Sequence, residues 1–240
     1  MSGTWHIERR VATAAELHRE WPAPESRGRR RAALCTVTGP RTLVVGSTQA
    51  AGRELPEFVD AVAVVRRGSG GGAVVVAPGA QVWVELWLPR GDPLWDDDVV
   101  RSGEWVGDAW QAALTEIGVG EPIAVHRGAT VFRPWAASVC FAGLGPGEVT
   151  VAGRKVVGLA QRRGRAGARF QTTVPLTWDG ACVVDALVAT GLLGDADANE
   201  VAASVAVQAV GLADVADAGG RLLAAAEDAL VSSLAHVGSS

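Results

Sequence analysis

Three consecutive glycines, Gly70 to Gly72, interrupt a stretch of branched apolar residues. Of all the features of the chain, they say most about the structure it can form there. The run Ala61–Val65 reads as a strand, and Arg66-Arg67-Gly68-Ser69-Gly70-Gly71-Gly72-Ala73-Val74 follows it. A loop that lacks Cβ atoms lets backbone N–H groups approach a phosphate or carboxylate closely. Arg66 and Arg67 add guanidinium donors for the same oxyanions. The alternative is a tight glycine hairpin with a solvated arginine pair.

Two familiar phosphate-binding motifs do not account for this loop. Gly68 to Ala73 formally matches G-x-G-x-x-A, but that fingerprint requires a helix directly after it. Here the next residues are Val74-Val75-Val76-Ala77-Pro78-Gly79, a short strand that ends in a turn. A P-loop ends in Gly-Lys-Ser/Thr, and this loop contains no lysine. We therefore reject both motifs.

The chain contains a single lysine. Of its 22 Lys and Arg residues, only Lys155 carries an ammonium group, in the segment Val151-Ala152-Gly153-Arg154-Lys155-Val156-Val157-Gly158. An ammonium is a compact charge on a flexible stem and can approach one reacting oxygen, whereas a guanidinium is a planar fork. A chemical role for Lys155 is one interpretation. The other is an arginine-biased composition that happened to leave one lysine.

The order of the elements predicts an α+β fold with a largely antiparallel sheet, because strands come first and helices later without regular β-α-β alternation. The segment Gln81–Leu88 alternates apolar residues on one face with Trp83, Glu85 and Trp87 on the other. A short turn at Ala152-Gly153 predicts a hairpin that places Lys155 at the start of its returning strand. The expected strands are Leu34–Thr38, Thr42–Val45, Ala61–Arg66, Ala73–Ala77, Gln81–Leu88, Val149–Val151, 155–163 and Ala168–Val174.

Helices are predicted near the start, in the middle and at the end of the chain. Ala12–Trp21 reads as a short amphipathic helix. A longer helix is expected from Asp96 to Glu116, because acids suit the positive end of a helix and Val99, Val106, Trp110 and Leu114 have the spacing of a buried stripe. The arginine run Gly28–Arg31 is expected to be solvated. Three further helices are expected at 183–191, 197–210 and 218–235.

The charge balance and the cysteines limit the classes of protein. The net charge of −4 and pI of about 5.6 disfavour a nucleic-acid or anionic-membrane surface. The first ten residues lack the apolar region of a secretory signal. Cys35, Cys140 and Cys182 are an odd, sparse set that suits a reducing cytoplasm. The four histidines form no metal-ligand spacing, so no metal site is expected.

The glycine loop and the segment Gly153–Arg163 together resemble the biotin/lipoate protein ligase superfamily, most closely its lipoate-protein ligase and octanoyltransferase branch. Leu43–Gln49 and Val139–Ala142 resemble further segments of that family in the same order, and the likeness spans about residues 34–174. It implies a mostly antiparallel central sheet flanked by helices, of the class II aminoacyl-tRNA synthetase and biotin–lipoate ligase kind. It also implies one catalytic domain over 1–240, with its motifs in about 32–180 and a helical part over 181–240.

The resemblance implies transfer of a lipoyl or octanoyl group to a lysine of an apo lipoyl carrier domain. In the ligase route, which we take as the first interpretation, ATP and Mg²⁺ convert lipoate or octanoate to an acyl-adenylate. In the transferase route the acyl group comes from another carrier, and no cofactor is needed. Lys155 is expected to stabilise negative charge on the acyl oxygen. The expected binding residues are Arg66, Arg67, Ser69, Gly70, Gly71, Gly72, Ala73, Gly158 and Ala160.

Cys140 separates the two routes, because it matches the nucleophilic cysteine of one octanoyltransferase group. A nearby ammonium would favour its thiolate form, whereas a buried inert cysteine is the common alternative. His126 is a weaker candidate for its base. The chain departs from the family where Val74–Pro78 lacks a histidine and where Gly164–Gln171 differs. A third interpretation is a non-catalytic protein that binds a lipoyl carrier or an acyl-nucleotide and tolerates Lys155→Ala.

Overall fold

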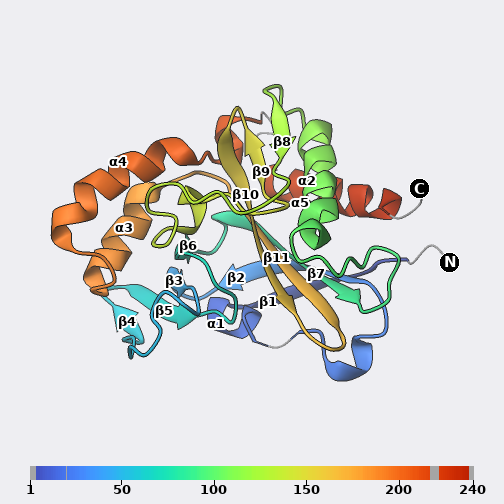
Figure 1. Cartoon of the computed structure of the whole chain (residues 1–240), viewed down its shortest axis with the longest axis horizontal. Coiled ribbons are helices and arrows are strands. Elements are labelled where there is room, and N and C mark those ends of the chain that lie inside the picture. Colours follow the sequence, from blue (N-terminus) through green and yellow to red (C-terminus); the bar gives the residue numbers. More distant parts are fainter. Residues whose placement is uncertain (1–3, 20, 217–221, 238–240) are drawn as a thin grey trace.

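A seven-stranded sheet forms the centre of the computed structural model, which describes residues 4–19, 21–216 and 222–237 (Figure 1). The two strands nearest the N-terminus are parallel, and every other neighbouring pair is antiparallel. The large sheet has the order β1 (His6–Thr13), β2 (Arg31–Thr38), β7 (Gln81–Pro89), β11 (Gly167–Pro175), β10 (Arg154–Arg163), β9 (Val149–Val151) and β8 (Ile123–Val125).

A smaller sheet carries the glycine loop. It pairs four short strands in the order β4 (Phe58–Val59), β5 (Val62–Arg66), β3 (Thr42–Val45) and β6 (Val74–Val76). The glycine loop connects β5 to β6, which lie on opposite sides of β3. The loop therefore crosses the end of β3.

Helices cover the two sheets at opposite ends of the molecule (Figure 1). The helices α2 (Glu104–Glu116) and α5 (Leu222–His236) bury Trp110 and Leu230 against one face of the large sheet. The helices α3 (Gly180–Ala189) and α4 (Ala198–Gln208) pack on the smaller sheet. The other face of the large sheet packs against β3, β6 and the short α1 (Ala14–Leu17).

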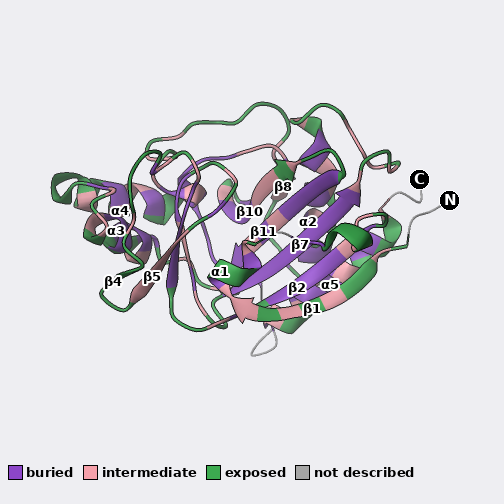
Figure 2. Cartoon of the chain, turned by 90° about the horizontal axis from the view of Figure 1, so that it is seen from below, coloured by how far each residue is buried: buried purple, intermediate pink, exposed green. Residues whose placement is uncertain are grey.

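The strand β7 is the middle of this arrangement, because both of its faces are covered (Figure 2). Its even-numbered residues from Val82 to Leu88 join the core beneath α2 and α5, and Trp83 and Trp87 join the core on the other side. The alternation in the sequence predicted this division. The exception is Glu85, a carboxylate that is 0% exposed.

Glu85 is buried because three side chains neutralise and bind it. It accepts hydrogen bonds from Arg10 on β1, from Arg169 on β11 at 2.5 Å and from Gln171 at 2.7 Å. Arg169 also donates to the main-chain oxygens of Leu17 and Arg19. A buried charge is stable only when it is paired and hydrogen-bonded. This cluster therefore joins β1, β7, β11 and α1.

The fold class and the β9–β10 hairpin are confirmed. Ala152 and Gly153 have φ of 48° and 79°, the paired positive values of a two-residue mirror-image turn. Lys155 lies at the start of the returning strand, as predicted. The expected central and C-terminal helices occur with shifted ends, and residues 218–221 of the last one lie outside the described residues. Strands β1, β4 and β8 were not predicted.

The predicted helix over Ala12–Trp21 is wrong for most of its length. Residues up to Thr13 form β1, which pairs in parallel with β2, and only four residues are helical. Thr13 caps this turn, since its hydroxyl accepts from the amide of Glu16 and the Glu16 carboxylate accepts from the amide of Thr13. Pairing with β2 overrides the weak local helical pattern.

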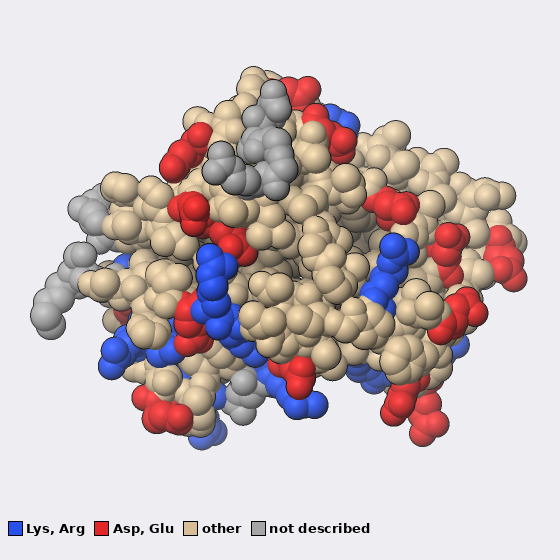
Figure 3. All heavy atoms as spheres, turned by 180° about the vertical axis from the view of Figure 1, so that it is seen from behind, with Lys and Arg blue, Asp and Glu red and all other residues tan. Residues whose placement is uncertain are grey.

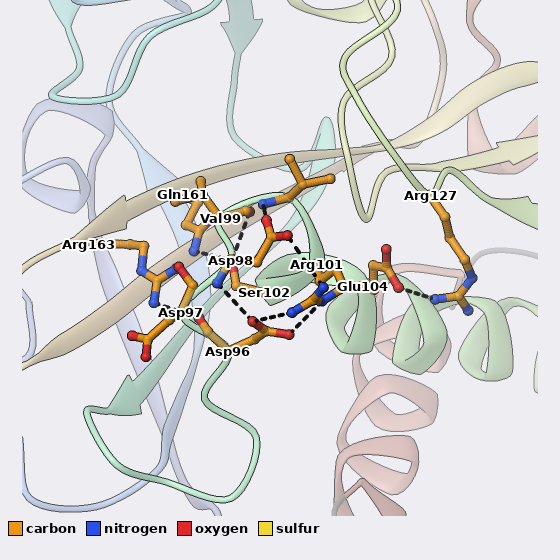
Figure 4. A network of polar contacts seen from close by, with 11 residues as sticks. Asp96, Asp97, Asp98, Val99, Arg101, Ser102, Glu104, Arg127, Gln161 and Arg163 are labelled. Carbon is orange, nitrogen blue, oxygen red and sulfur yellow. Dashed lines mark hydrogen bonds and ion pairs between the residues drawn. The ribbon is translucent and has the colours of Figure 1, made fainter.

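The central helix begins later than predicted, at Glu104 rather than at Asp96 (Figure 4). Asp96 accepts from the amide of Asp98, and Asp98 accepts from the amide of Val100, so the acids stabilise a turn instead of a helix. Hydrogen bonds from Arg101 hold the pKa of Asp96 below its usual value. Val99 is 61% exposed and is not part of the buried stripe.

The arginine run Gly28–Arg31 is not simply solvated. Arg30 is buried and donates twice to the carboxylate of Asp92, and Arg31 donates to Glu8. Elsewhere acidic and basic side chains are interspersed, as the face in Figure 3 shows. Among the described residues no helix has both the length and the apolar character to cross a membrane.

Removing the charge of Glu85 tests the buried cluster. We expect Glu85→Gln to lower the free energy of unfolding by about 3–5 kcal/mol, because Arg169 keeps its buried charge without a partner. Glu104→Gln is the matched control, because its ion pair with Arg127 is exposed on the Arg127 side, and it should cost less than about 1 kcal/mol. Urea denaturation measures both. Equal losses would contradict a special role for the cluster.

Candidate active site

The glycine loop is fixed at both of its ends by backbone and by one arginine. Its amides and carbonyls bond to the end of β3, from Arg67 N to Val45 O at 2.9 Å and from Ser47 N to Ser69 O at 2.9 Å. The Arg67 guanidinium donates to the carbonyls of Gly70 and Gly72 at 2.7 and 2.8 Å. Arg67 is 5% exposed. It therefore shapes the loop from within.

The loop then lies directly against the segment that carries Cys140. Ala73 N donates to Ser138 O and Cys140 N donates to Ala73 O, both at 2.8 Å. A Cβ on Gly72 would be 2.6 Å from the backbone of Val139 and 2.8 Å from the amide of Cys140. Only glycine permits this approach. The last glycine of the loop thus sets the place of Cys140.

Lys155 is buried beneath that same segment. Its side chain is 2% exposed, and its Nζ lies 2.6 Å from Oε2 of Glu148. The Nζ also donates to the carbonyls of Cys140 at 2.9 Å and Gly143 at 3.2 Å. A bulge in the β9–β10 pairing lies at Lys155–Val157, and bulges commonly re-aim a side chain beside a site. The three protons of the ammonium are all engaged.

Glu148 is a site residue that the sequence did not reveal. Besides its ion pair with Lys155, it accepts from the amide of Gly145 at 2.7 Å and from that of Leu159 at 3.0 Å. It is buried. The one signal available was an isolated acid in the otherwise uncharged stretch 144–151. Because Glu148 binds a loop, a strand and the lysine at once, it fixes the geometry around Cys140.

Two adjoining cavities meet at Cys140. The first, which we call the glycine-loop cavity, has a volume of about 240 Å³ and includes Ser69, Gly70–Gly72, Glu148 and Lys155 in its walls. The second, the apolar cavity, has a volume of about 40 Å³ and includes Val44, Trp83, Phe141 and Gly158. The residues that line both are Arg67, Cys140, Leu159 and Ala160.

The apolar cavity continues past Phe141 into a further space of about 160 Å³, which shares Val74, Phe141 and Thr173. His18 lines the apolar cavity and lies 5.0 Å from the ring of Trp83. Burial, together with the charges of neighbouring arginines, lowers the pKa of His18 to about 3. The imidazole is therefore neutral near pH 7. Apart from Arg67, whose guanidinium faces the loop carbonyls, the wall is uncharged and mostly apolar, which suits a hydrocarbon chain.

Most of the residues expected at the site meet there. Arg67, Ser69, the three glycines, Cys140, Lys155 and Ala160 line the glycine-loop cavity, and Gly158 lines the apolar one. Ala73 is buried in the bridge to Val139. Arg66 lies elsewhere, because it donates to the carbonyls of Ala50 and Arg53 at 2.6 and 2.7 Å. His126 bonds to Ala129 O outside both cavities.

The three cysteines differ in their surroundings. Cys35 is buried in the core, and burial raises the pKa of its thiol. Cys182 is partly exposed near Arg41, and burial also raises its pKa. Cys140 is partly exposed and is the one that lines the two cavities. Of the three thiols, Cys140 is therefore the one placed where the two cavities meet.

A methyl group on Gly72 should displace the Cys140 segment. We expect Gly72→Ala to lower the free energy of unfolding by about 1–3 kcal/mol through overpacking and to change the alkylation rate of Cys140. At Gly70, the nearest atom to an added Cβ is Thr48 Oγ1 at 3.7 Å, so Gly70→Ala is the matched control and should stay within about 1 kcal/mol. Urea denaturation and iodoacetamide labelling measure the two effects. Identical behaviour of both variants would refute the contact.

The Lys155–Glu148 pair should behave as a coupled unit. We expect Lys155→Met and Glu148→Gln each to cost about 3–5 kcal/mol, because each leaves a buried group unpaired. The double variant should cost less than the sum by about 1–3 kcal/mol. The exposed pair Arg154–Glu121, 3.8 Å apart, provides a control cycle with coupling below about 1 kcal/mol. Additive losses at Lys155 and Glu148 would show that the pair is not coupled.

Comparison with known proteins places this chain in a family. The model of the lipoyl protein ligase A/B catalytic domain matches residues 11–215. A search of curated proteins found no match. The chain is similar in fold to a bipartite lipoate protein ligase from Thermoplasma acidophilum, whose structural study also covers its E2 lipoyl domain, with a TM-score of 0.65, 14% identity, and 96% of this chain and 84% of that one covered.

Two further solved structures share the fold. A lipoate-protein ligase A bound with ATP has a TM-score of 0.63 at 15% identity and covers 95% of this chain and 85% of its own. P. falciparum LipL1 in complex with lipoate has a TM-score of 0.57 at 12% identity and covers 96% and 62%. Likeness at such identities shows the fold, and the family model extends over most of the sequence. The chain belongs to the lipoyl protein ligase A/B catalytic domain family, within the biotin/lipoate protein ligase superfamily.

Proposed function

We propose that this protein moves a lipoyl or octanoyl group from a thioester donor to a lysine of a lipoyl carrier domain, with Cys140 as the intermediate acyl carrier. One observation carries the proposal: Cys140 lies in the walls of both the apolar cavity and the glycine-loop cavity. An acyl chain in the first cavity brings its carboxyl end to Cys140. The second cavity then admits the donor and, afterwards, the acceptor amine.

The reaction divides into two exchanges at Cys140. The thiol of Cys140 gives up its proton, its sulfur attacks the carbonyl carbon of the donor thioester, and the donor leaves as a thiol that carries the proton released by Cys140. The neutral amine of the acceptor lysine then attacks the Cys140 thioester. The C–S bond breaks, an amide forms, and the proton lost by the amine returns to the sulfur of Cys140. Atoms and charge balance without a cofactor.

In this proposal Lys155 acts mainly on the placement of Cys140. Its ammonium holds the main-chain oxygens of Cys140 and Gly143 and is paired with Glu148. The positive charge also lies close to where the oxyanion of each exchange would form, which lowers the energy of that charge. Ser69 supplies a further donor, since its Oγ is buried without a hydrogen-bond partner among the described residues and the residue lines the same cavity.

The charges of the glycine-loop cavity favour this route over an ATP-dependent one. Its charged residues are Arg67, Glu148 and Lys155. The guanidinium of Arg67 faces loop carbonyls and the ammonium of Lys155 faces Glu148. A triphosphate with its metal ion needs several donors that are free to bind it. The charged side chains of this cavity therefore offer few free donors to a triphosphate, although ATP is bound by the lipoate-protein ligase A that shares the fold.

The deciding measurement is the intact mass of this protein and of an apo lipoyl carrier domain after incubation with an octanoyl thioester. We expect octanoate first on Cys140 and then on the carrier domain. Cys140→Ala should lower transfer by at least about a thousandfold, because removing a catalytic nucleophile can cost as much as about 10⁶-fold. Cys35→Ala is the matched control, because Cys35 lies in the core and lines neither cavity, and it should retain transfer.

Parallel incubations with octanoate or lipoate, Mg²⁺ and ATP test the ligase alternative. Mass gain that requires ATP and survives Cys140→Ala would overturn the proposal in favour of an acyl-adenylate. If no mass gain occurs with any donor while the carrier domain still binds, the protein is a non-catalytic binding protein.

A further inference from the structure

A third cavity, outside the site described above, lies at the tip of the β10–β11 hairpin. It has a volume of about 390 Å³ and is walled by Trp21, Trp87 and residues of the hairpin. Five arginines line this hairpin-tip cavity, and no carboxylate of a described residue does. They are Arg27, Arg162, Arg163, Arg165 and Arg169.

The arginines of the hairpin differ in whether their side chains already have partners within the protein. Arg169 is neutralised by Glu85. Arg163 donates to the main-chain oxygens of Asp96 and Asp97 and stacks on Trp95, so it is held in place (Figure 4). The side chains of Arg162 and Arg165 are exposed and have no hydrogen bond or ion pair with any described residue. Their guanidinium groups are free to bind an anion.

The hairpin-tip cavity lies on the same face of the sheet as the apolar cavity. Side chains alternate along a strand, so Arg162 projects on the same side of β10 as Gly158 and Ala160, which line the apolar cavity. The register agrees, because Arg162 is paired with Arg169 and Ala160 with Gln171. Consecutive residues on one face of β10 therefore lead from Cys140 to the hairpin tip.

Arg162 also reaches the glycine loop. A Cβ on Gly68 would be 2.9 Å from Nη1 of Arg162, so the guanidinium lies against the first glycine of the loop. The path from Ala160 to the tip at Arg165 is on the order of 15 Å, at about 3.3 Å per extended residue. A ligand that reacts at Cys140 and extends along this path ends among the arginines.

We propose that the hairpin-tip cavity binds the phosphate ester of the acyl donor, at the far end of a pantetheine arm whose thioester reacts at Cys140. This inference rests on the proposed transferase function. The arm itself carries neutral amides, so its phosphate is the group that free guanidinium donors recognise. Several arginines surround this cavity, and their combined positive charge is larger than one carboxylate can balance. The cavity therefore favours a phosphate over a carboxylate as its ligand. Both a carrier-bound arm and a free coenzyme thioester carry this group.

Binding without chemistry provides the first test. We expect 4′-phosphopantetheine to bind the intact protein at least about 10-fold more tightly than pantetheine in a calorimetric titration, since charge-assisted hydrogen bonds to phosphate distinguish them. The difference should disappear in the double variant Arg162→Gln/Arg165→Gln. Arg154→Gln, which removes one positive charge at the other end of β10, should retain it. Equal binding of both compounds to the wild-type protein would overturn the inference.

Acylation of Cys140 provides the second test. Octanoyl-4′-phosphopantetheine should acylate Cys140 with a higher kcat/KM than octanoyl-pantetheine, mainly through KM, and the double variant should treat the two alike. Carrier-bound and coenzyme A-bound octanoate, compared in parallel, distinguish the two sources of the phosphate. Because Arg162 and Arg165 are exposed, the melting temperature should not change.

The two tests separate this inference from the function on which it rests. If phosphate-dependent binding is found but no donor acylates Cys140, the phosphate site stands and the transferase proposal fails. If Cys140 is acylated equally by phosphorylated and unphosphorylated donors, the transferase proposal stands and the phosphate site is wrong.

Discussion

The buried ion pair between Lys155 and Glu148 is the interaction on which the site depends. It joins a bulged strand to the loop that carries Cys140, since the same ammonium also holds the carbonyls of Cys140 and Gly143. Neither charge is stable alone at this depth. The strand β10, the Glu148 carboxylate and the loop with Cys140 must therefore come together before any of them takes its final position. The glycine loop then joins the assembly through the Ala73–Val139 bridge.

The large sheet separates stability from chemistry by its two faces. Trp110 and Leu230 from the two covering helices fill the core on one face of β7. The other face carries Trp83 and Glu85 and continues across β11 to Gly158 and Ala160 of β10. Substitutions on the first face are expected to act on folding. Substitutions on the second face act on what the cavities hold, and at the core residues Trp83 and Trp87 and at the buried charge of Glu85 they also act on folding.

Parts of this structure follow from the sequence, and the remainder depends on contacts that a sequence pattern does not contain. Alternation from Val82 to Leu88 and the Ala152-Gly153 turn are local signals, and both elements were predicted. The acids at Asp96 and Asp98 fit a helix start and an aspartate turn equally well, and local hydrogen bonds decided between them. Arg66 and Arg67 are alike in sequence, yet only Arg67 is enclosed by the loop, because neighbours at the end of a strand point in opposite directions. Glu148 was missed because two of its partners, Lys155 and Leu159, lie on β10 and reach it only when the hairpin is folded.

The single lysine has one more consequence, which concerns acylation of the protein itself. An enzyme that delivers activated acyl groups to amines risks acylating amines of its own side chains. This chain presents arginine at every other basic position, and guanidinium groups are poor nucleophiles because they stay protonated. Its one primary amine on a side chain is enclosed, ion-paired and fully hydrogen-bonded. Under the proposed transfer reaction, the fold leaves no lysine of its own to compete with the acceptor, and self-acylation would be confined to Cys140.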